Sequence, residues 1–88
     1  MEKNTKTIKV IVNFPAASNP FKQEFEPAET IGSVRTAAMQ QFGVDENPST
    51  KYYLAHAGTK LEDSQTIGEV AGHAKAVELT LVKEIVSG

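Results

Sequence analysis

The chain of 88 residues contains no cysteine and no long hydrophobic run. Without cysteine it cannot form a disulfide, a thiolate metal site or a nucleophilic thiol, and it cannot carry a thioester itself. No stretch approaches the length that spans a membrane, and the polar residues 1–7 lack the apolar core of a signal peptide. These absences indicate a soluble protein, which we expect to be cytoplasmic.

Neither sign of charge dominates. Nine basic and 11 acidic residues leave a net charge of −2, which gives no electrostatic reason to bind nucleic acid or an anionic membrane. The hydrophobic content of 40% and the charged content of 23% are typical of globular proteins and argue against disorder. A chain of this length forms one small domain, which we expect to be a monomer.

The residues that usually build an active site are scarce. His56 and His73 are the only histidines, and no carboxylate stands at a metal-ligand spacing from either of them. Glu24 and Glu26 would share one face of a strand, but we interpret them as a solvated rim rather than an acid–base pair. The chain also lacks a Gly-x-Ser-x-Gly elbow, a P-loop and a dinucleotide-binding motif. We therefore expect no enzymatic activity, no metal and no cofactor.

Alternating hydrophobic residues predict four strands, at 8–14, 21–27, 51–57 and 76–82. A short fifth strand is expected to begin at Leu61, after a sharp reversal at Gly58. In the longer strands the side chains expected to face inward are Ile8, Val10, Val12, Phe14, Tyr52, Leu54, Val77, Leu79 and Leu81. Tyr53 and Ala55 would then face outward.

One helix is predicted between the second and third of these strands. Thr30 is its expected N-cap, Gly43 is its expected C-cap, and Pro48 blocks continuation. Gly32 in the first turn weakens it by up to about 1 kcal/mol. Thr66 and Glu69 have the spacing of a capping box, which predicts a second, short helical turn. The apolar stripe of the first helix is Ile31, Val34, Ala38 and Phe42.

This order of elements predicts an α+β fold, a mixed sheet of four to five strands with one helix packed across it. The domain is expected to cover residues 7–82, with flexible segments at 1–6 and 83–88.

Two segments resemble ubiquitin. Glu24–Val34, Glu-Phe-Glu-Pro-Ala-Glu-Thr-Ile-Gly-Ser-Val, is similar to the segment that leads into ubiquitin's helix. Leu54–Asp63, Leu-Ala-His-Ala-Gly-Thr-Lys-Leu-Glu-Asp, is similar to the ubiquitin segment that contains Ala-Gly-x-x-Leu-Glu-Asp, and Ser64–Glu69 continues the similarity. The resemblance runs from about Phe21 to Val82 and implies the ubiquitin-like β-grasp fold.

Proteins with this fold act as covalent modifiers, as binding modules or as sulfur carriers, and the fold alone does not choose among these functions. Modifiers and sulfur carriers end in Gly-Gly, whereas this sequence ends in Ser87-Gly88, preceded by Glu84, Ile85 and Val86. Glycine is nevertheless the last residue, so the resemblance implies a modifier. Because the residues before Gly88 differ from those of ubiquitin, it implies a dedicated enzyme, as in a prokaryotic conjugation system. Gly88 would be activated by a cognate ATP-dependent enzyme and joined to target proteins, with conjugating enzymes or an isopeptidase as further partners. The first alternative is a non-covalent interaction module, and the second is a sulfur carrier with a terminal thiocarboxylate.

Ubiquitin's receptors mostly dock on an apolar patch on the outer face of the sheet. The corresponding positions here are Ala55, Glu78 and Thr80, which offer little apolar area, so those receptors should bind poorly. Tyr53 on the same face could anchor a different partner, or it could simply cover the edge of the sheet. The candidate acceptor for chain formation is Lys60, next to Thr59 at the position of ubiquitin's main chain-forming lysine, although a solubilising role is the default for a surface lysine.

Overall fold

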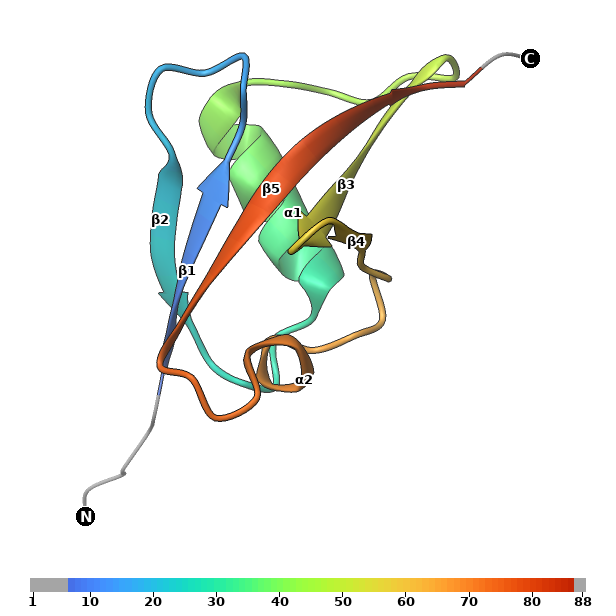
Figure 1. Ribbon diagram of the computed structural model, residues 1–88. Coiled ribbons are helices and arrows are strands. Elements are labelled where there is room, and N and C mark those ends of the chain that lie inside the picture. The colour runs from blue at the N-terminus through green and yellow to red at the C-terminus, as the bar shows by residue number, and fades with distance from the viewer. Residues whose placement is uncertain (1–6, 87–88) are drawn as a thin grey trace.

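The computed structural model describes residues 7–86 and contains a five-stranded sheet with a helix across one face (Figure 1). The strand order is β2-β1-β5-β3-β4, in which β1 and β5 are parallel and the other neighbours are antiparallel. This mixed sheet confirms the predicted ubiquitin-like α+β fold. The elements are β1 (Ile8–Asn13), β2 (Phe21–Phe25), α1 (Ile31–Phe42), β3 (Thr50–His56), β4 (Thr59–Lys60), α2 (Ile67–Ala71) and β5 (Ala76–Ile85).

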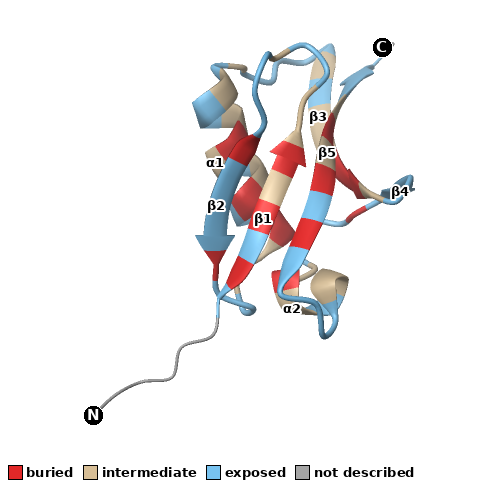
Figure 2. Ribbon diagram, turned by 60° about the vertical axis from the view of Figure 1, so that its left-hand side comes forward, coloured by how far each residue is buried: buried red, intermediate tan, exposed pale blue. Residues whose placement is uncertain are grey.

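The core lies between the sheet and α1, and it follows the predicted alternation. Figure 2 shows buried and more exposed residues in turn along β1 and β5, because successive strand residues point to opposite faces. The predicted inward residues of these strands are at most 6% exposed. Phe14 and Tyr52 are half-buried, and their ring centroids lie 6.0 Å apart at the rim of the core.

The predicted caps of α1 are present. The Thr30 hydroxyl accepts a hydrogen bond from the Ser33 N–H at 3.2 Å, and Gly43 adopts a left-handed conformation with φ 73°. Of the predicted apolar stripe, three residues are buried, while Phe42 is half-buried and packs against Phe14 with 5.1 Å between ring centroids. Local sequence rules thus set both ends of this helix. Within residues 7–86, no helix has the length and apolar character needed to cross a membrane.

The N-termini of α1 and α2 lie against each other, and we call this contact the helix joint. Thr30 and Thr66, the two N-caps, form an isolated β-bridge. The Ile31 N–H donates to the Gln65 carbonyl at 2.8 Å, and the Ile67 N–H donates to the Glu29 carbonyl at 2.9 Å. Each helix therefore uses the segment before the other helix to satisfy N–H groups that have no partner within the helix.

Two glycines allow this close approach. A Cβ at Gly32 would lie 3.2 Å from the Asp63 Cβ, and a Cβ at Gly68 would lie 3.1 Å from the Pro27 Cβ. Their N–H groups donate to the Asp63 and Pro27 carbonyls at 3.1 and 2.9 Å. The glycine that is unfavourable for the helix propensity of α1 is thus favoured by a tertiary contact. The capping box predicted for Thr66 and Glu69 is present.

The predicted start of the short strand at Leu61 is wrong. β4 consists of Thr59–Lys60, and Leu61 follows it with 7% of its surface exposed. The reason is the two-residue turn at Ala57 and Gly58, with φ 53° and 84°, which pairs His56 with Thr59 directly.

The predicted end of the last strand at Val82 is also wrong, because β5 continues to Ile85. β3 begins at Thr50 and supplies partners that far: Lys51 pairs with Glu84, and Thr50 pairs with Ile85. Part of the segment expected to be a flexible tail is therefore strand. Residues 1–6 and residues 87–88, which include the proposed conjugation residues Ser87 and Gly88, lie outside the described residues.

Candidate functional site

The outer face of the sheet, opposite α1, carries the predicted interaction residues on β3 and β5. Ala55 pairs with Thr80, and Thr80 pairs with Asn13 on the other side, so these three residues form one row across the sheet. Glu78 lies beside Ile11 of β1, and its carboxylate accepts a hydrogen bond from the Asn13 amide at 2.7 Å. This hydrogen bond orients the Glu78 side chain on the outer face.

Ala55 differs from its expected role as a contact residue. It lies on the outer face as predicted, but only 9% of its surface is exposed. It can form the floor of a binding surface but offers little contact area. Thr80 and Tyr53 are half-buried and Glu78 is exposed, so these three residues remain accessible to a partner.

The structure brings Tyr53 together with Lys60, two residues singled out for different reasons. The Lys60 Nζ lies 4.9 Å from the centroid of the Tyr53 ring, and it also lies 4.0 Å from a Glu84 carboxylate oxygen. The Lys60 and Glu84 side chains are 58% and 49% exposed, so this ion pair is screened by water and contributes little stability. The candidate acceptor lysine thus covers the ring of the candidate aromatic anchor.

Sequence reasoning missed one residue of this face, Asn13. It lines a shallow cleft that also borders His56, Glu78 and Thr80, between the β3–β4 turn and α2. Asn13 follows the outward alternation of β1, but its contact with Glu78 depends on the parallel pairing of β1 with β5. No local pattern predicts that pairing.

The end of β5 forms a second candidate region. The N–H of Val86 donates to the carbonyl of Ser49 at 2.8 Å, one residue beyond the strand pairs. Ile85 and Val86 are 65% and 39% exposed, and they are the large hydrophobic residues that residues 7–86 leave most open to solvent. We call the paired segments Ser49–Lys51 and Glu84–Val86 the ribbon end.

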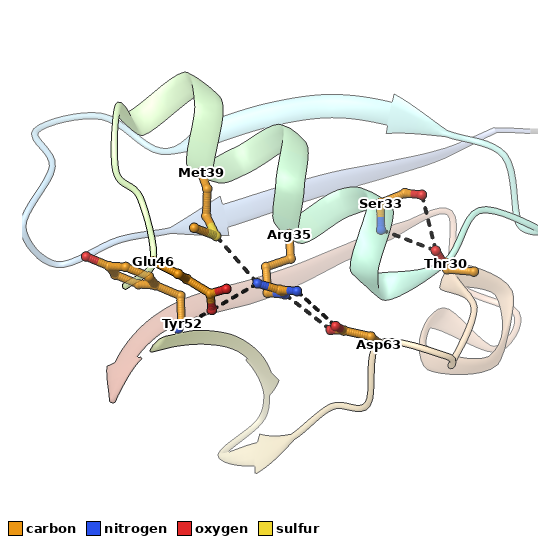
Figure 3. A network of polar contacts seen from close by, with 7 residues as sticks. All are labelled: Thr30, Ser33, Arg35, Met39, Glu46, Tyr52 and Asp63. Atoms are coloured by element: carbon orange, nitrogen blue, oxygen red, sulfur yellow. Dashed lines mark hydrogen bonds and ion pairs between the residues drawn. The ribbon is translucent and has the colours of Figure 1, made fainter. Parts of the chain in front are cut away.

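Arg35 ties α1 to two loops (Figure 3). Its guanidinium donates to both oxygens of Asp63, at 3.2 and 2.9 Å, and to Glu46 at 3.2 Å. The same Glu46 oxygen accepts the N–H of Tyr52 at 2.9 Å. The hydrogen bonding of the Arg35 guanidinium to the Asp63 carboxylate raises the pKa of Arg35, burial opposes this effect, and the charges of Asp63 and Glu46 raise the pKa further. Because Arg35 is 17% exposed and its partners belong to the fold, we assign it a structural role.

Within residues 7–86, histidine, aspartate and glutamate do not form a group of three that could hold a metal ion. The contacts of the two candidate regions are a carboxylate that accepts a hydrogen bond from an amide, a lysine over an aromatic ring, and a paired strand end.

The model of one protein family, BilA ubiquitin-like domain 2, matches residues 9–84. The chain belongs to this family. The chain also has structural neighbours. The ubiquitin of Caldiarchaeum subterraneum superposes with a TM-score of 0.71 and 25% identity, over 93% of this chain and 99% of that one. A second structure, described by the words molecular mimicry of SUMO promotes DNA repair, gives a TM-score of 0.70. It covers 92% of this chain and 96% of its own, but at 10% identity it shows the fold alone. None of the curated proteins matches the chain in sequence.

Proposed function

We propose that this ubiquitin-like domain is a protein modifier of a prokaryotic conjugation system, attached to target proteins through the carboxylate of Gly88. The observation that supports this proposal is the course of β5. The strand runs past Leu81, its last fully buried residue, to the exposed Ile85, and so leads the chain away from the core toward Ser87 and Gly88. Family membership and the similarity to an archaeal ubiquitin support the same function.

The chemistry requires a cognate activating enzyme. The carboxylate of Gly88 would attack the α-phosphate of ATP, form an acyl-adenylate and release pyrophosphate. A thiol of the enzyme would then displace AMP, and an amine of the target, such as a lysine, would displace the thiol. The domain is in this scheme a substrate of enzymes and not a catalyst. We place the reaction in the cytoplasm because it consumes ATP.

The test is adenylation by the cognate activating enzyme, measured as exchange of pyrophosphate into ATP. We expect exchange with the intact chain and none after deletion of Gly88. Ser87→Gly is the matched control, and it should keep the activity because glycine presents less bulk to the enzyme. If the intact chain supports no exchange, the proposal is wrong.

A second candidate function is non-covalent binding through the outer face. Its support is the set of contacts that hold Glu78 and Tyr53 in place, because side chains that are already ordered lose less entropy when a partner binds. The structure also changes how this function should be tested. Removal of residues 83–88 would destroy part of β5, so only Ser87 and Gly88 should be deleted.

For this second function, affinity for the partner protein should survive deletion of Ser87 and Gly88 and should fall at least tenfold in Tyr53→Ala. Lys22→Ala, on the exposed part of β2, serves as the control. Loss of binding on deletion alone would favour the modifier and count against the binding module.

A further inference from the structure

The end of β5 is held on one side only. β1 pairs with β5 from Ala76 to Thr80, and the pairs from Leu81 onward are made with β3 alone. Within the described sheet, the last five residues of β5 therefore behave as an edge strand. Beyond Leu81 the side chains of Lys83, Glu84 and Ile85 are exposed, so little buried apolar surface holds this segment in place.

The partner strand is anchored much better. The carboxylate of Glu46 accepts the N–H of Tyr52 and is itself bound by Arg35 of α1. Before β3, Asn47 and Thr50 exchange two backbone hydrogen bonds, of 3.0 and 3.1 Å. The Asn47 side chain also accepts the Ser49 N–H at 2.9 Å. If the ribbon end opens, β5 will therefore move while β3 stays with the body of the domain.

We propose that Glu84–Val86 must separate from β3 before Gly88 can be adenylated, so that the activating enzyme receives this segment as a single extended strand. The inference rests on the proposed function of Gly88 as the point of attachment. Pairing places the Asn47–Thr50 turn beside Val86, and two further residues reach only about 7 Å. A neighbouring strand adds about 4.8 Å of width. With the ribbon closed, the turn would enter the enzyme's site together with the tail.

Separation also frees the backbone groups that now pair with β3. The Val86 N–H and the backbone groups by which Glu84 pairs with Lys51 become available to an edge strand of the enzyme, as in recognition by strand addition. If only the open form binds, the apparent affinity for the activating enzyme is reduced in proportion to the fraction of molecules that are open. Local opening is easiest where a paired segment buries little apolar surface, so the ribbon end should open more readily than the rest of the sheet.

A disulfide across the ribbon end tests the proposal, and the absence of cysteine makes the bond unique. Thr50 and Ile85 are cross-strand partners next to the pair that contains the Val86–Ser49 hydrogen bond. Side chains of alternate antiparallel pairs lie closest together, at a spacing that a disulfide can bridge. The variant is Thr50→Cys/Ile85→Cys. The control is Ile11→Cys/Lys22→Cys, which joins β1 to β2 far from the ribbon end.

The readout is pyrophosphate exchange with the cognate activating enzyme, in oxidised and reduced samples whose disulfide state is confirmed by mass. We expect the oxidised ribbon variant to react at least tenfold more slowly than its reduced form, and the control to react equally in both states. Equal rates for the two forms of the ribbon variant would overturn the proposal, because the enzyme would then accept the closed ribbon.

A second measurement separates this inference from the proposed function. Hydrogen exchange of the Val86 amide should be slower than in an unstructured peptide, and at least tenfold slower again in the oxidised ribbon variant. A wild-type chain that supports no pyrophosphate exchange contradicts the proposed function. If the Val86 amide exchanges as fast as in an unstructured peptide, the ribbon end is not closed. If the disulfide does not slow its exchange, the ribbon end does not open. Either result contradicts the proposed opening.

Discussion

The helix joint and the ribbon end are both held by backbone hydrogen bonds, but their surroundings differ. At the joint, Ile31 and Ile67 are fully buried and each donates its N–H to the segment before the other helix. At the ribbon end, the hydrogen bond of Val86 is as short, yet Ile85 beside it is 65% exposed. The comparison teaches that hydrogen bonds specify which segments pair, while buried apolar surface decides how firmly they stay paired.

The largest difference between the two regions should come from the same substitution made in each. We expect Ile67→Ala to reduce the free energy of unfolding by about 2–5 kcal/mol, since it leaves a cavity in the core. Ile85→Ala should change it by less than about 0.5 kcal/mol because the side chain is exposed. Urea denaturation measures both values. Similar losses at the two positions would show that the ribbon end is packed as firmly as the joint.

A methyl group added at the joint should be the next most damaging change. Gly68→Ala places a Cβ 3.1 Å from the Pro27 Cβ and 3.2 Å from the Pro27 carbonyl oxygen, so we expect a loss of about 1–3 kcal/mol. Gly32→Ala should cost less, because its Cβ would meet the Asp63 side chain at 3.2 and 3.4 Å, whereas the Cβ at Gly68 meets a proline ring atom and a backbone carbonyl. Thermal unfolding of the two variants tests this order. A neutral Gly68→Ala would show that the joint can relax.

The two cationic contacts offer a comparison of the same kind. Arg35→Met removes three hydrogen bonds to carboxylates, and we expect it to reduce the free energy of unfolding by about 1–3 kcal/mol. Lys60→Met removes an exposed pair and should cost less than about 0.5 kcal/mol. The raised pKa of Arg35 means that its contribution is lost only above its ordinary titration range, so it should be constant across neutral pH. Urea denaturation of the two variants at two salt concentrations measures both losses of stability, and denaturation across neutral pH tests the constancy of the Arg35 contribution.

One substitution in the turn between β3 and β4 should increase stability. Ala57 adopts φ 53° in the turn between β3 and β4, where asparagine followed by glycine is strongly preferred. Ala57→Asn should raise the free energy of unfolding by about 0.5–1 kcal/mol, since the left-handed conformation is unfavourable for alanine and is adopted more readily by asparagine. Ala57→Val is the control and should be destabilising. A lower melting temperature for Ala57→Asn would contradict this account of the turn.

Much of the fold could be predicted from local patterns. The alternation in β1 and β5 identified the residues that face the core, and the threonine and glycine caps located both ends of α1. The same reasoning placed Tyr53 and Glu78 on the outer face. It did not reveal that Ala55 is nearly buried, because burial on that face depends on which strands stand on either side.

The sequence did not predict how far β5 extends or which distant residues contact each other. The pattern ends at Val82 because Lys83 and Glu84 are polar, but β5 continues as long as β3 provides partners. Likewise, Arg35 and Asp63 are 28 residues apart, and their contact cannot be inferred from either local segment. Gly32 was read as a weakness of α1, while its reason lies in the approach of Asp63.

The sequence by itself therefore determined which residues face inward, where α1 begins and ends, and the ubiquitin-like order of the elements. Those properties depend on neighbours within a few positions along the chain. Only the tertiary structure decided that Lys60 covers Tyr53, that Asn13 holds Glu78, and that β5 stays paired as far as Ile85. Those properties depend on which strands lie side by side, and that pairing is fixed by the packing of the whole core.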